Sequence, residues 1–327
     1  MANMNDVAKR ANVSRGTVSN YINNVRIKEA SRIKVEEAIK ELAYIPDVGA
    51  REFKTNKSSN VVFILPTVWN PFFSELTYQL QIKLKEKGMK LILCNSQDDY
   101  RAEIEYLEIA QQNKVFGIIS ISYSDIMPYL TSKIPYVAIE RYYNEDIPYV
   151  TSDNEGGGKM AVNELIKKGC QKLLHVTRQV DGNNALIARK KGFEEACKEQ
   201  NADYEIFNPK TSSAAFHEDI AIFLKEAFNK GKQFDGIFCA TDRYASYCQD
   251  ALSDMGIDIP EDVQIIGFDG SQSYATEKLK ISTIRQPVEK IAQEAVNLLI
   301  AVVNKDKQQN SIVLPVTFLD LKTTKSN

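Results

Sequence analysis

Apolar residues repeat along this chain with two spacings, and the change falls near residue 60. Before that point they recur every three to four residues, which is the period of an α-helix. Beyond it, short continuous apolar runs alternate with amphipathic stretches, which predicts an α/β fold of parallel sheets that helices cover on both faces. The predicted strands are residues 61–65, 90–94, 117–122, 136–139, 173–177, 236–240 and 263–268, with another near Tyr149 and closing strands between residues 312 and 321. The predicted helices are residues 72–87, 102–112, 155–168, 186–200, 216–229, 243–255 and 288–304.

The first 46 residues predict a small bundle of three helices. The first helix opens around Asp6, the second covers residues 15–22 and the third residues 29–42. Ser14 suits the cap of the second helix, because its hydroxyl can accept a hydrogen bond from a free amide of the next turn. Two helices joined by so short a turn are typical of a helix-turn-helix, which places its second helix in the major groove of DNA. On this pattern alone, a plain three-helix bundle remains the alternative.

In a helix-turn-helix, the first turns of the second helix face the bases. Arg can pair with guanine and Asn with adenine, whereas short polar side chains suit phosphates, which position the protein without specifying sequence. The base-reading candidates are Arg15, Gly16, Thr17 and Asn20, and the phosphate-binding candidates are Ser14, Ser19 and Asn23.

Domain boundaries follow from composition and length. Pro46 ends the headpiece of residues 1–46, and residues 47–59 form a polar linker with a marginal helix. Residues 60–327 are too many for one sheet, so we expect two similar lobes. The first lobe should hold about residues 60–155 and 288–315, and the second about residues 156–287 and 316–327. Residues 1–59 carry 11 Lys and Arg against 7 Asp and Glu, while the rest carries 30 against 36, and a basic head on an acidic body favours contact with a polyanion.

Several classes of function find no support in the residues. His175 and His217 stand outside any metal-ligand spacing and no CxxC pair occurs, so we expect no metal and reduced core thiols. The run Gly156-Gly157-Gly158-Lys159 lacks the spacing and the Ser or Thr of a phosphate loop. No nucleophile and base are suggested, so we expect neither an enzyme nor a cofactor. No run of membrane-spanning length and no signal segment occurs, which predicts a cytoplasmic protein without a membrane partner.

Ligands of open α/β sheets bind beyond the carboxyl ends of the strands, so the residues that follow each strand are candidates. Aromatic rings pack on the apolar face of a sugar, while carboxylates and guanidinium groups bond its hydroxyls. The candidates for effector binding are Asn70, Phe72, Phe73, Tyr123, Asp153, Arg189, Asp242 and Asp269. Plainer alternatives are helix capping for Asp153 and Asp242, core packing for the two Phe residues, a surface cation for Arg189 and a turn for Asp269.

Short motifs stand in a fixed order along the chain. The headpiece holds Asp6-Val7-Ala8, Val13-Ser14 and Thr17-Val18-Ser19. The core holds Asn70-Pro71-Phe72-Phe73, Ser152-Asp153-Asn154, Arg189 with Gly192-Phe193, Gly267-Phe268-Asp269 and Ile284-Arg285-Gln286-Pro287. As an ordered set that spans the whole chain, they resemble the LacI/GalR (lactose repressor) family of transcription regulators.

The resemblance implies a core like that of periplasmic binding proteins, a homodimer and a palindromic operator of double-stranded DNA. It implies minor-groove contact by the hinge residues Ala50 and Phe53, and effector binding by Asp153, Arg189 and Asp269. The chain departs from the family pattern at Gly16, Asn20 and Phe53, which predicts an operator of its own. Lys28 stands where the family usually has a Ser that caps the third helix. The chain ends without a heptad repeat, so we expect a dimer and not a tetramer.

These patterns together predict a transcription regulator, most simply a repressor, whose operator affinity a sugar or sugar phosphate controls. A sugar-binding receptor without a DNA role remains an alternative, although the basic head disfavours it. An α/β enzyme that acts on a sugar is a second alternative, although the chain offers no catalytic set. A nucleobase or a partner protein as effector also stays open.

Overall fold

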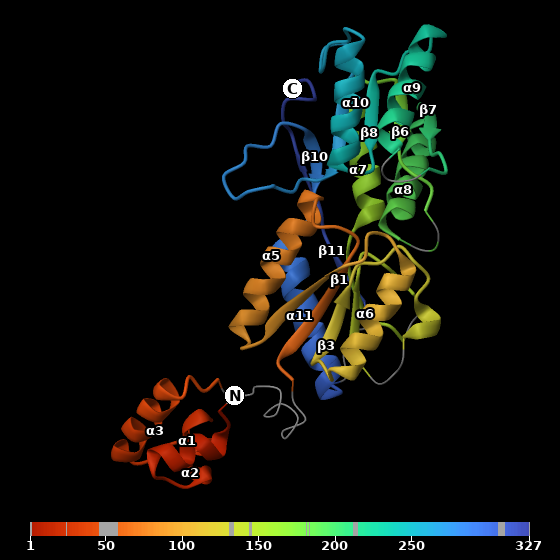
Figure 1. The fold of residues 1–327 in the computed structure, drawn as a ribbon. Helices are drawn as coiled ribbons and strands as arrows, with labels where there is room; N and C mark the ends of the chain where they lie inside the picture. Colours follow the sequence, from red (N-terminus) through yellow and green to blue (C-terminus); the bar gives the residue numbers. More distant parts are fainter. Residues whose placement is uncertain are drawn as a thin grey trace. The chain divides into compact units, whose positions relative to one another are not determined.

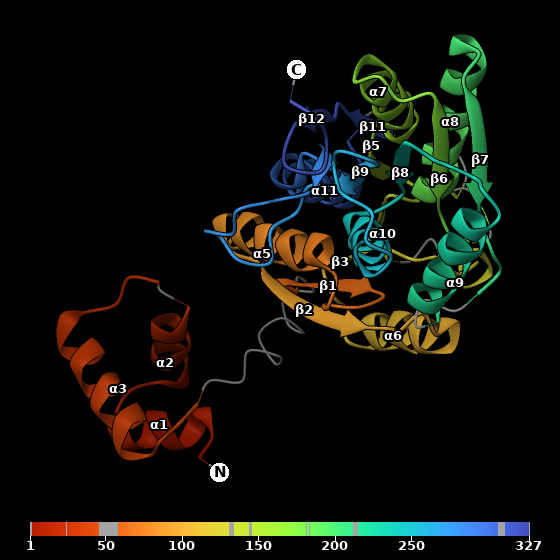
Figure 2. The ribbon, with the colours of Figure 1, turned by 90° about the horizontal axis from the view of Figure 1, so that it is seen from above.

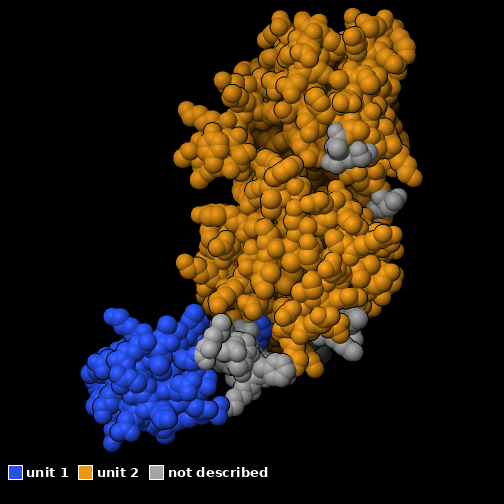
Figure 3. Space-filling model, viewed as in Figure 1, with its two compact units in different colours: residues 1–58 blue, residues 59–327 orange. Residues whose placement is uncertain are grey.

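The computed structural model describes residues 2–23, 25–45, 58–130, 134–143, 146–180, 182, 184–211, 215–306 and 311–326. The chain separates into two compact units, Met1–Ser58 and Ser59–Asn327 (Figure 3). The predicted hinge residues Ala50 and Phe53, and the marginal helix around them, lie outside the described residues. No helix in the described part of the chain is both long and apolar enough to cross a membrane.

The described residues of the first unit form three helices, α1 (Met4–Ala11), α2 (Arg15–Ile22) and α3 (Glu29–Glu41). Ser14 caps α2 as predicted, with its Oγ accepting from the amide of Thr17 at 3.1 Å. Lys28 takes the cap position of α3 and provides no side-chain cap bond. One apolar side of each helix fills the small core, which includes Val7, Ala8, Ala11, Val18, Val35 and Ala38.

The second unit contains two six-stranded sheets (Figure 1). The first sheet has the order β11-β5-β4-β3-β1-β2, and all its neighbouring strands are parallel. Its strands are β1 (Asn60–Leu65), β2 (Lys90–Asn95), β3 (Gly117–Ser120), β4 (Tyr136–Ile139), β5 (Tyr149–Ser152) and β11 (Ser311–Leu314). Three α-helices and a short 3-10 helix complete this lobe: α5 (Pro71–Glu86), α6 (Tyr100–Gln112), η1 (Met127–Tyr129) and α11 (Val288–Asn304).

Alternating side chains of β1 show why helices cover both faces of the first sheet. Val61, Phe63 and Leu65 belong to the cluster that includes α5 and α11, whereas Val62 and Ile64 belong to the cluster that includes α6. Every residue of this central strand from Val61 onward is buried, so it reads as a continuous apolar run. Figures 1 and 2 show α5 and α11 side by side on one face and α6 on the other.

The second sheet has the order β12-β10-β9-β8-β6-β7, and only β12 runs antiparallel to its neighbour. Its strands are β6 (Lys172–Val176), β7 (Asp203–Phe207), β8 (Gly236–Cys239), β9 (Gln264–Asp269), β10 (Ser282–Arg285) and β12 (Thr317–Leu319). The helices α7 (Asn154–Lys167) and α8 (Ala185–Gln200) cover one face, and α9 (Phe216–Asn229) and α10 (Asp242–Asp254) cover the other. All five cysteines are free, and Cys170, Cys197, Cys239 and Cys248 are buried.

The chain passes between the two sheets three times, after β5, after β10 and after β11. The carboxyl ends of both sheets meet at this seam, because Glu140, which follows β4, and Asp269, which ends β9, both contact Arg189. The seam between the lobes is therefore the place where the topology gathers strand-end residues from both sheets.

Candidate functional site

Two glycines bring α7 and α8 into backbone contact and thereby place Arg189. A β-carbon on Gly192 would lie 2.0 Å from the carbonyl oxygen of Glu155, and one on Gly158 would lie 2.3 Å from that of Arg189. Both distances are far shorter than van der Waals contact, so this helix crossing requires glycine at both positions. Arg189 consequently lies against the start of α7, where it is only 3% exposed.

The Arg189 guanidinium joins the two lobes. Its Nε donates to Asn154 Oδ1 at 2.8 Å, and its Nη1 donates to Ala240 O at 2.6 Å and to Asp269 Oδ1 at 3.4 Å. Its Nη2 lies 3.7 Å from Oε2 of Glu140, which belongs to the first lobe. A buried guanidinium needs such a full set of acceptors, because an unpaired charge in the interior is costly.

Glu140 closes the network from the side of the first lobe. Its Oε1 accepts from the amide of Ser152 at 2.7 Å, and its Oε2 accepts from Asn154 Nδ2 at 2.8 Å. The Ser152 hydroxyl donates in turn to Gln286 Oε1 at 2.7 Å. Hydrogen bonds thus run from the first lobe to Asp269 across two of the three crossovers. We call this set the seam network: Glu140, Ser152, Asn154, Arg189, Asp269 and Gln286.

Asp269 is the acid at the centre of the seam network. Its Oδ1 accepts from Gln286 Nε2 at 2.7 Å as well as from Arg189. Its φ of 117° is rare for a residue with a β-carbon, and such strain is typical of functional sites. Burial raises the pKa of Asp269 to about 6, while the Arg189 charge opposes that rise. A carboxyl with this pKa changes its charge near neutral pH and is suited to accept hydrogen bonds from ligand hydroxyls.

A cavity of about 480 Å³ opens beside the seam network. Its lining includes Asn70 and Phe72 from the first lobe, and Asp242, Asp269 and Ser271 from the second. The buried Ser271 hydroxyl has no hydrogen-bond partner among the described residues, and a bound polar ligand would supply one. The volume suits a small ligand, and Figure 3 shows the surface of the second unit hollowed between the lobes.

The structure brings six of the predicted effector residues to the seam and its cavity. Asn70 caps α5 by accepting from the amide of Phe72 at 2.9 Å. Tyr123 follows the carboxyl end of β3, its side chain packs against the core of the first lobe, and burial raises the pKa of its phenol. The six residues are Asn70, Phe72, Tyr123, Arg189, Asp242 and Asp269.

Three of the predicted effector residues have local structural roles, and one of these three also lines the cavity. Phe73 packs in the core of the first lobe. Asp153 caps α7 by accepting from the amide of Gly156 at 2.8 Å, and it lines a different hollow. Asp242 lines the cavity, but both of its carboxylate oxygens are engaged, by Gly270 N at 2.7 Å and Thr283 Oγ1 at 2.5 Å. The cap of α10 is its neighbour Thr241, which corrects the capping alternative for Asp242.

The start of α2 presents the predicted base-reading surface of the headpiece. Arg15, Gly16 and Asn20 are exposed and Thr17 is half-buried. The predicted phosphate ligands carry internal bonds. Asn23 Nδ2 donates to Ser19 O at 2.7 Å, and Ser14 caps α2. Backbone and cap thus fix the first turn of the helix and leave its outer side chains accessible.

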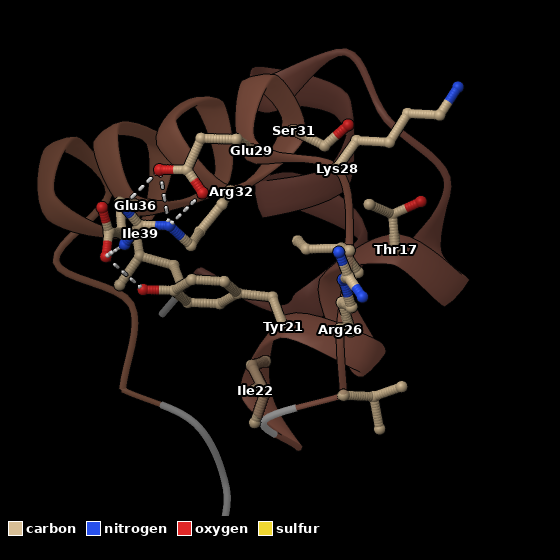
Figure 4. A pocket seen from close by; sticks show the side chains of 12 residues that line it. Thr17, Tyr21, Ile22, Arg26, Lys28, Glu29, Ser31, Arg32, Glu36 and Ile39 are labelled. Carbon is tan, nitrogen blue, oxygen red and sulfur yellow. Dashed lines mark hydrogen bonds and ion pairs between the residues drawn. The ribbon is translucent and has the colours of Figure 1, made fainter.

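A groove lies between α2 and α3, and the segment that joins them lines it (Figure 4). Arg32 forms ion pairs there with Glu29 at 2.6 Å and Glu36 at 2.9 Å. Arg26 and Lys28 are exposed, and neither has an ion pair within the described part of the chain. These two cations share the groove with Thr17 and were not among the residues predicted to bind DNA.

Comparison with known proteins agrees with this architecture. Residues 3–47 match the family described as bacterial regulatory proteins, lacI family, and residues 162–324 match a periplasmic binding protein-like domain. The ribose operon repressor of Halalkalibacterium halodurans is 34% identical over 308 residues, which cover 93% of this chain and 91% of that protein. The sucrose operon repressor of Streptococcus mutans is 33% identical, with 98% of each chain covered. The chain belongs to the LacI family.

A solved structure from the same comparisons supports the two-lobed core of this LacI-family regulator. The periplasmic binding protein/LacI transcriptional regulator from Alkaliphilus metalliredigens, complexed with D-xylulofuranose, has a TM-score of 0.74 and 31% identity, and the match covers 82% of this chain and all of that one. The predicted recognition and α/β fold class are therefore confirmed. The protein is a DNA-binding transcription regulator and not an enzyme.

Sequence reasoning missed four members of the seam network in this LacI-family chain: Glu140, Ser152, Asn154 and Gln286. Ser152 stood in the same quoted motif as Asn154. Asn154 and Gln286 stood inside quoted motifs, and their polar side chains beside a crossover were the available signal. Glu140 gave no comparable signal, because its role depends on a φ of 57° that turns the chain after β4 and on contacts with the other lobe.

Proposed function

We propose that this LacI-family chain is a homodimeric repressor of a carbohydrate operon, and that a sugar bound at the seam sets its affinity for a palindromic operator. The observation that carries the proposal is the seam network, in which one buried guanidinium and two carboxylates bridge the lobes beside a cavity. Because the network is made of contacts from both lobes, a ligand that replaces some of these bonds changes how the lobes fit together. We infer that the protein acts in the cytoplasm, on DNA of the nucleoid.

On the DNA side, Arg15, Thr17 and Asn20 would read base edges, and Gly16 would leave one position unread. Ser14, Ser19 and Asn23 would position the helix on phosphates. Arg26 and Lys28 extend that set, because they are exposed cations on the segment between α2 and α3. Ala50 and Phe53 would contact the minor groove between two half-sites. The units Met1–Ser58 and Ser59–Asn327 would then serve as DNA-binding headpiece with hinge, and as effector-binding core.

On the effector side, Asp269 and Arg189 would bond the hydroxyls of a sugar, while Phe72 and Tyr123 would cover its apolar face. Asn70 would fix the start of α5 at the cavity. Phe73, Asp153 and Asp242 would support this site from the core, the α7 cap and the turn after β9. The names of the relatives make D-ribose and sucrose the first sugars to test, followed by D-xylulose and the phosphates of all three.

Apolar side chains at the edge of the first lobe support a homodimer. Among the described strands β2 pairs with β1 alone, and its Ile92 and Leu93 are 42% and 41% exposed. Tyr78 on the neighbouring helix α5 is 63% exposed. A second copy that covers these side chains would remove them from water. Sedimentation velocity at micromolar concentration should give the mass of two chains, and that of a single chain would remove the homodimer from the proposal.

The decisive experiment is a gel shift with DNA from upstream of the protein's own gene, repeated over a salt series and with each candidate sugar. We expect a specific complex that weakens steeply as salt rises, because phosphate contacts release counterions. One of the sugars should change the midpoint of the shift. The matched variant Asn20→Ala should lose preference for the upstream DNA over random DNA. A wild-type protein that binds both DNAs equally would end the proposal.

A further inference from the structure

Glu103 is a buried acid without a cation. It lies in the first turn of α6 and is 1% exposed. No Lys or Arg of the described residues forms an ion pair with it. Burial raises the pKa of its carboxyl, as expected for a charge removed from water. A buried carboxylate lowers the stability of the folded state, and an apolar side chain of similar size often gives a core equal or greater stability. The presence of Glu103 in the core therefore calls for a role other than stability.

Three serine hydroxyls surround the Glu103 carboxylate. Ser122 Oγ donates to Oε2 at 2.5 Å, Ser96 Oγ to Oε1 at 3.3 Å and Ser124 Oγ to Oε1 at 3.5 Å. Ser96 follows β2, whereas Ser122 and Ser124 follow β3 and stand on either side of Tyr123. One carboxylate therefore holds the two residues that flank a predicted effector-binding ring.

A second contact holds the same loop from the backbone side. The guanidinium of Arg141 donates to the carbonyl oxygen of Tyr123 at 3.5 Å and to that of Ser124 at 3.4 Å. Glu103 binds the hydroxyls of Ser122 and Ser124, and Arg141 binds the carbonyl oxygens of Tyr123 and Ser124. The backbone from which the Tyr123 ring extends is therefore held from two sides. Tyr123 follows the carboxyl end of β3, which lies on the side of the sheet that faces the seam, and its side chain packs against the core of the first lobe.

We propose that Glu103 is a positioning residue that fixes Tyr123 at the seam between the lobes through the hydroxyls of Ser122 and Ser124. This inference rests on the proposed function, in which Tyr123 covers the ligand. Glu103 does not touch the ligand itself. It sets the conformation of the loop after β3, and this positioning role explains why the chain keeps a carboxylate whose burial costs free energy of folding.

The test is a spectroscopic reading of Tyr123 that needs no ligand. 3-Fluorotyrosine is introduced at position 123 of the full chain, and its fluorine resonance is compared in wild type, Glu103→Leu, Ser122→Ala and the matched control Glu105→Leu. Glu105 is exposed on the same helix. We expect one narrow resonance in wild type and in the control, and a shifted or split resonance in the other two. Glu103→Gln, which retains one acceptor oxygen, should largely restore the wild-type signal.

Thermal denaturation separates positioning from plain stability. Glu103→Leu should stay folded at the temperature of the NMR measurement, because the removal of a buried charge counters the loss of an acceptor for the Ser96, Ser122 and Ser124 hydroxyls. A resonance unchanged in both Glu103→Leu and Ser122→Ala would overturn the inference. The inference would also be overturned if the Tyr123 signal of Glu103→Leu changed only in proportion to a loss of folded protein. Ser122→Ala is the smaller perturbation that checks this outcome. Failure of wild type to bind its operator would remove the proposed function but leave the resonance result standing, so the two failures are distinguishable.

Discussion

His175 should make the protein lose stability in mildly acidic solution. The side chain lies fully buried on β6, stacked against the rings of Phe193 and Phe238 at centroid distances of 5.0 and 4.8 Å. Its Nδ1 lies 3.0 Å from Phe238 O, and its Nε2 has no hydrogen-bond partner among the described residues. Burial lowers the pKa of His175 from 6.5 to about 3, because a charged imidazolium would have no water around it.

The size of the effect follows from proton linkage. Because the folded pKa lies below the unfolded one, the unfolded chain takes up the proton first as the pH falls. The stability that neutral His175 contributes is therefore present above pH 6.5 and lost below it. Between about pH 7.5 and about pH 5, the unfolded histidine becomes protonated while the folded one stays neutral, which lowers the free energy of unfolding by about 2 kcal/mol.

Urea unfolding at these two pH values, on wild type and on His175→Phe, measures that contribution. The variant keeps an aromatic stack and has no proton to bind, so its loss of stability should be smaller by about 2 kcal/mol. His217→Gln is the matched control, since His217 is exposed and should leave the difference unchanged. The chain has only two histidines, so their ring resonances can be titrated directly by NMR. Equal pH dependence in wild type and His175→Phe, or a His175 resonance that titrates near 6.5, would refute the reasoning.

Three further predictions concern the site and the headpiece. Gly192→Ala forces its β-carbon to within 2.0 Å of Glu155 O and should cost about 1–3 kcal/mol in urea unfolding, with exposed Lys198→Ala near neutral as its control. Lys28→Ser should supply the side-chain cap that α3 lacks and raise the amide-exchange protection of that helix about fivefold. It should also weaken operator binding at low salt, and unchanged protection would contradict the prediction. Sugar affinity measured by calorimetry should fall about tenfold from about pH 7 to about pH 5, because Asp269, with its pKa of about 6, becomes protonated. An Asp269→Asn protein with the same pH dependence would show that this carboxyl is not the cause.

Much of the fold could be predicted from local patterns. The bounds of α2, α9, α11 and β4 match the predicted residues, because buried stripes and cap residues mark them within a few positions of sequence. β7 and β10 were missed for a physical reason. β7 lies at the edge of its sheet and contains no buried residue, and its polar and apolar residues alternate only over its first four positions. β10 buries the hydroxyls of Ser282, which bonds to Thr324 near the end of the chain, and of Thr283, which donates to Asp242. Neither strand shows the continuous apolar run by which the buried strands were predicted.

The site was less predictable, because its geometry depends on contacts between lobes. Residues after strands could be named as candidates, and six of the eight gather at the seam and its cavity. Their partners could not be named, since Glu140 reaches Arg189 only after α7 and α8 cross at two glycines. The run Gly156-Gly157-Gly158 lacks the pattern of a phosphate loop and lies within α7, where it serves helix packing. Gly158 allows the helix contact that positions Arg189.

The balance of charge at the seam bears on the kind of effector that fits. Arg189 faces the carboxylates of Glu140 and Asp269, and Asp242 stands nearby with a pKa raised by burial and by Asp269. This excess of acid also keeps the Asp269 pKa high, since Glu140 adds to the effect of burial. A phosphate placed beside these groups would be repelled, by about 3 kcal/mol for one unit charge at about 5 Å in a medium of protein-like dielectric constant. A neutral sugar instead donates hydroxyl hydrogens to the carboxylates. We therefore expect the hydroxyl end of any effector to lie against Asp269, and any phosphate that it carries to point away from the seam network.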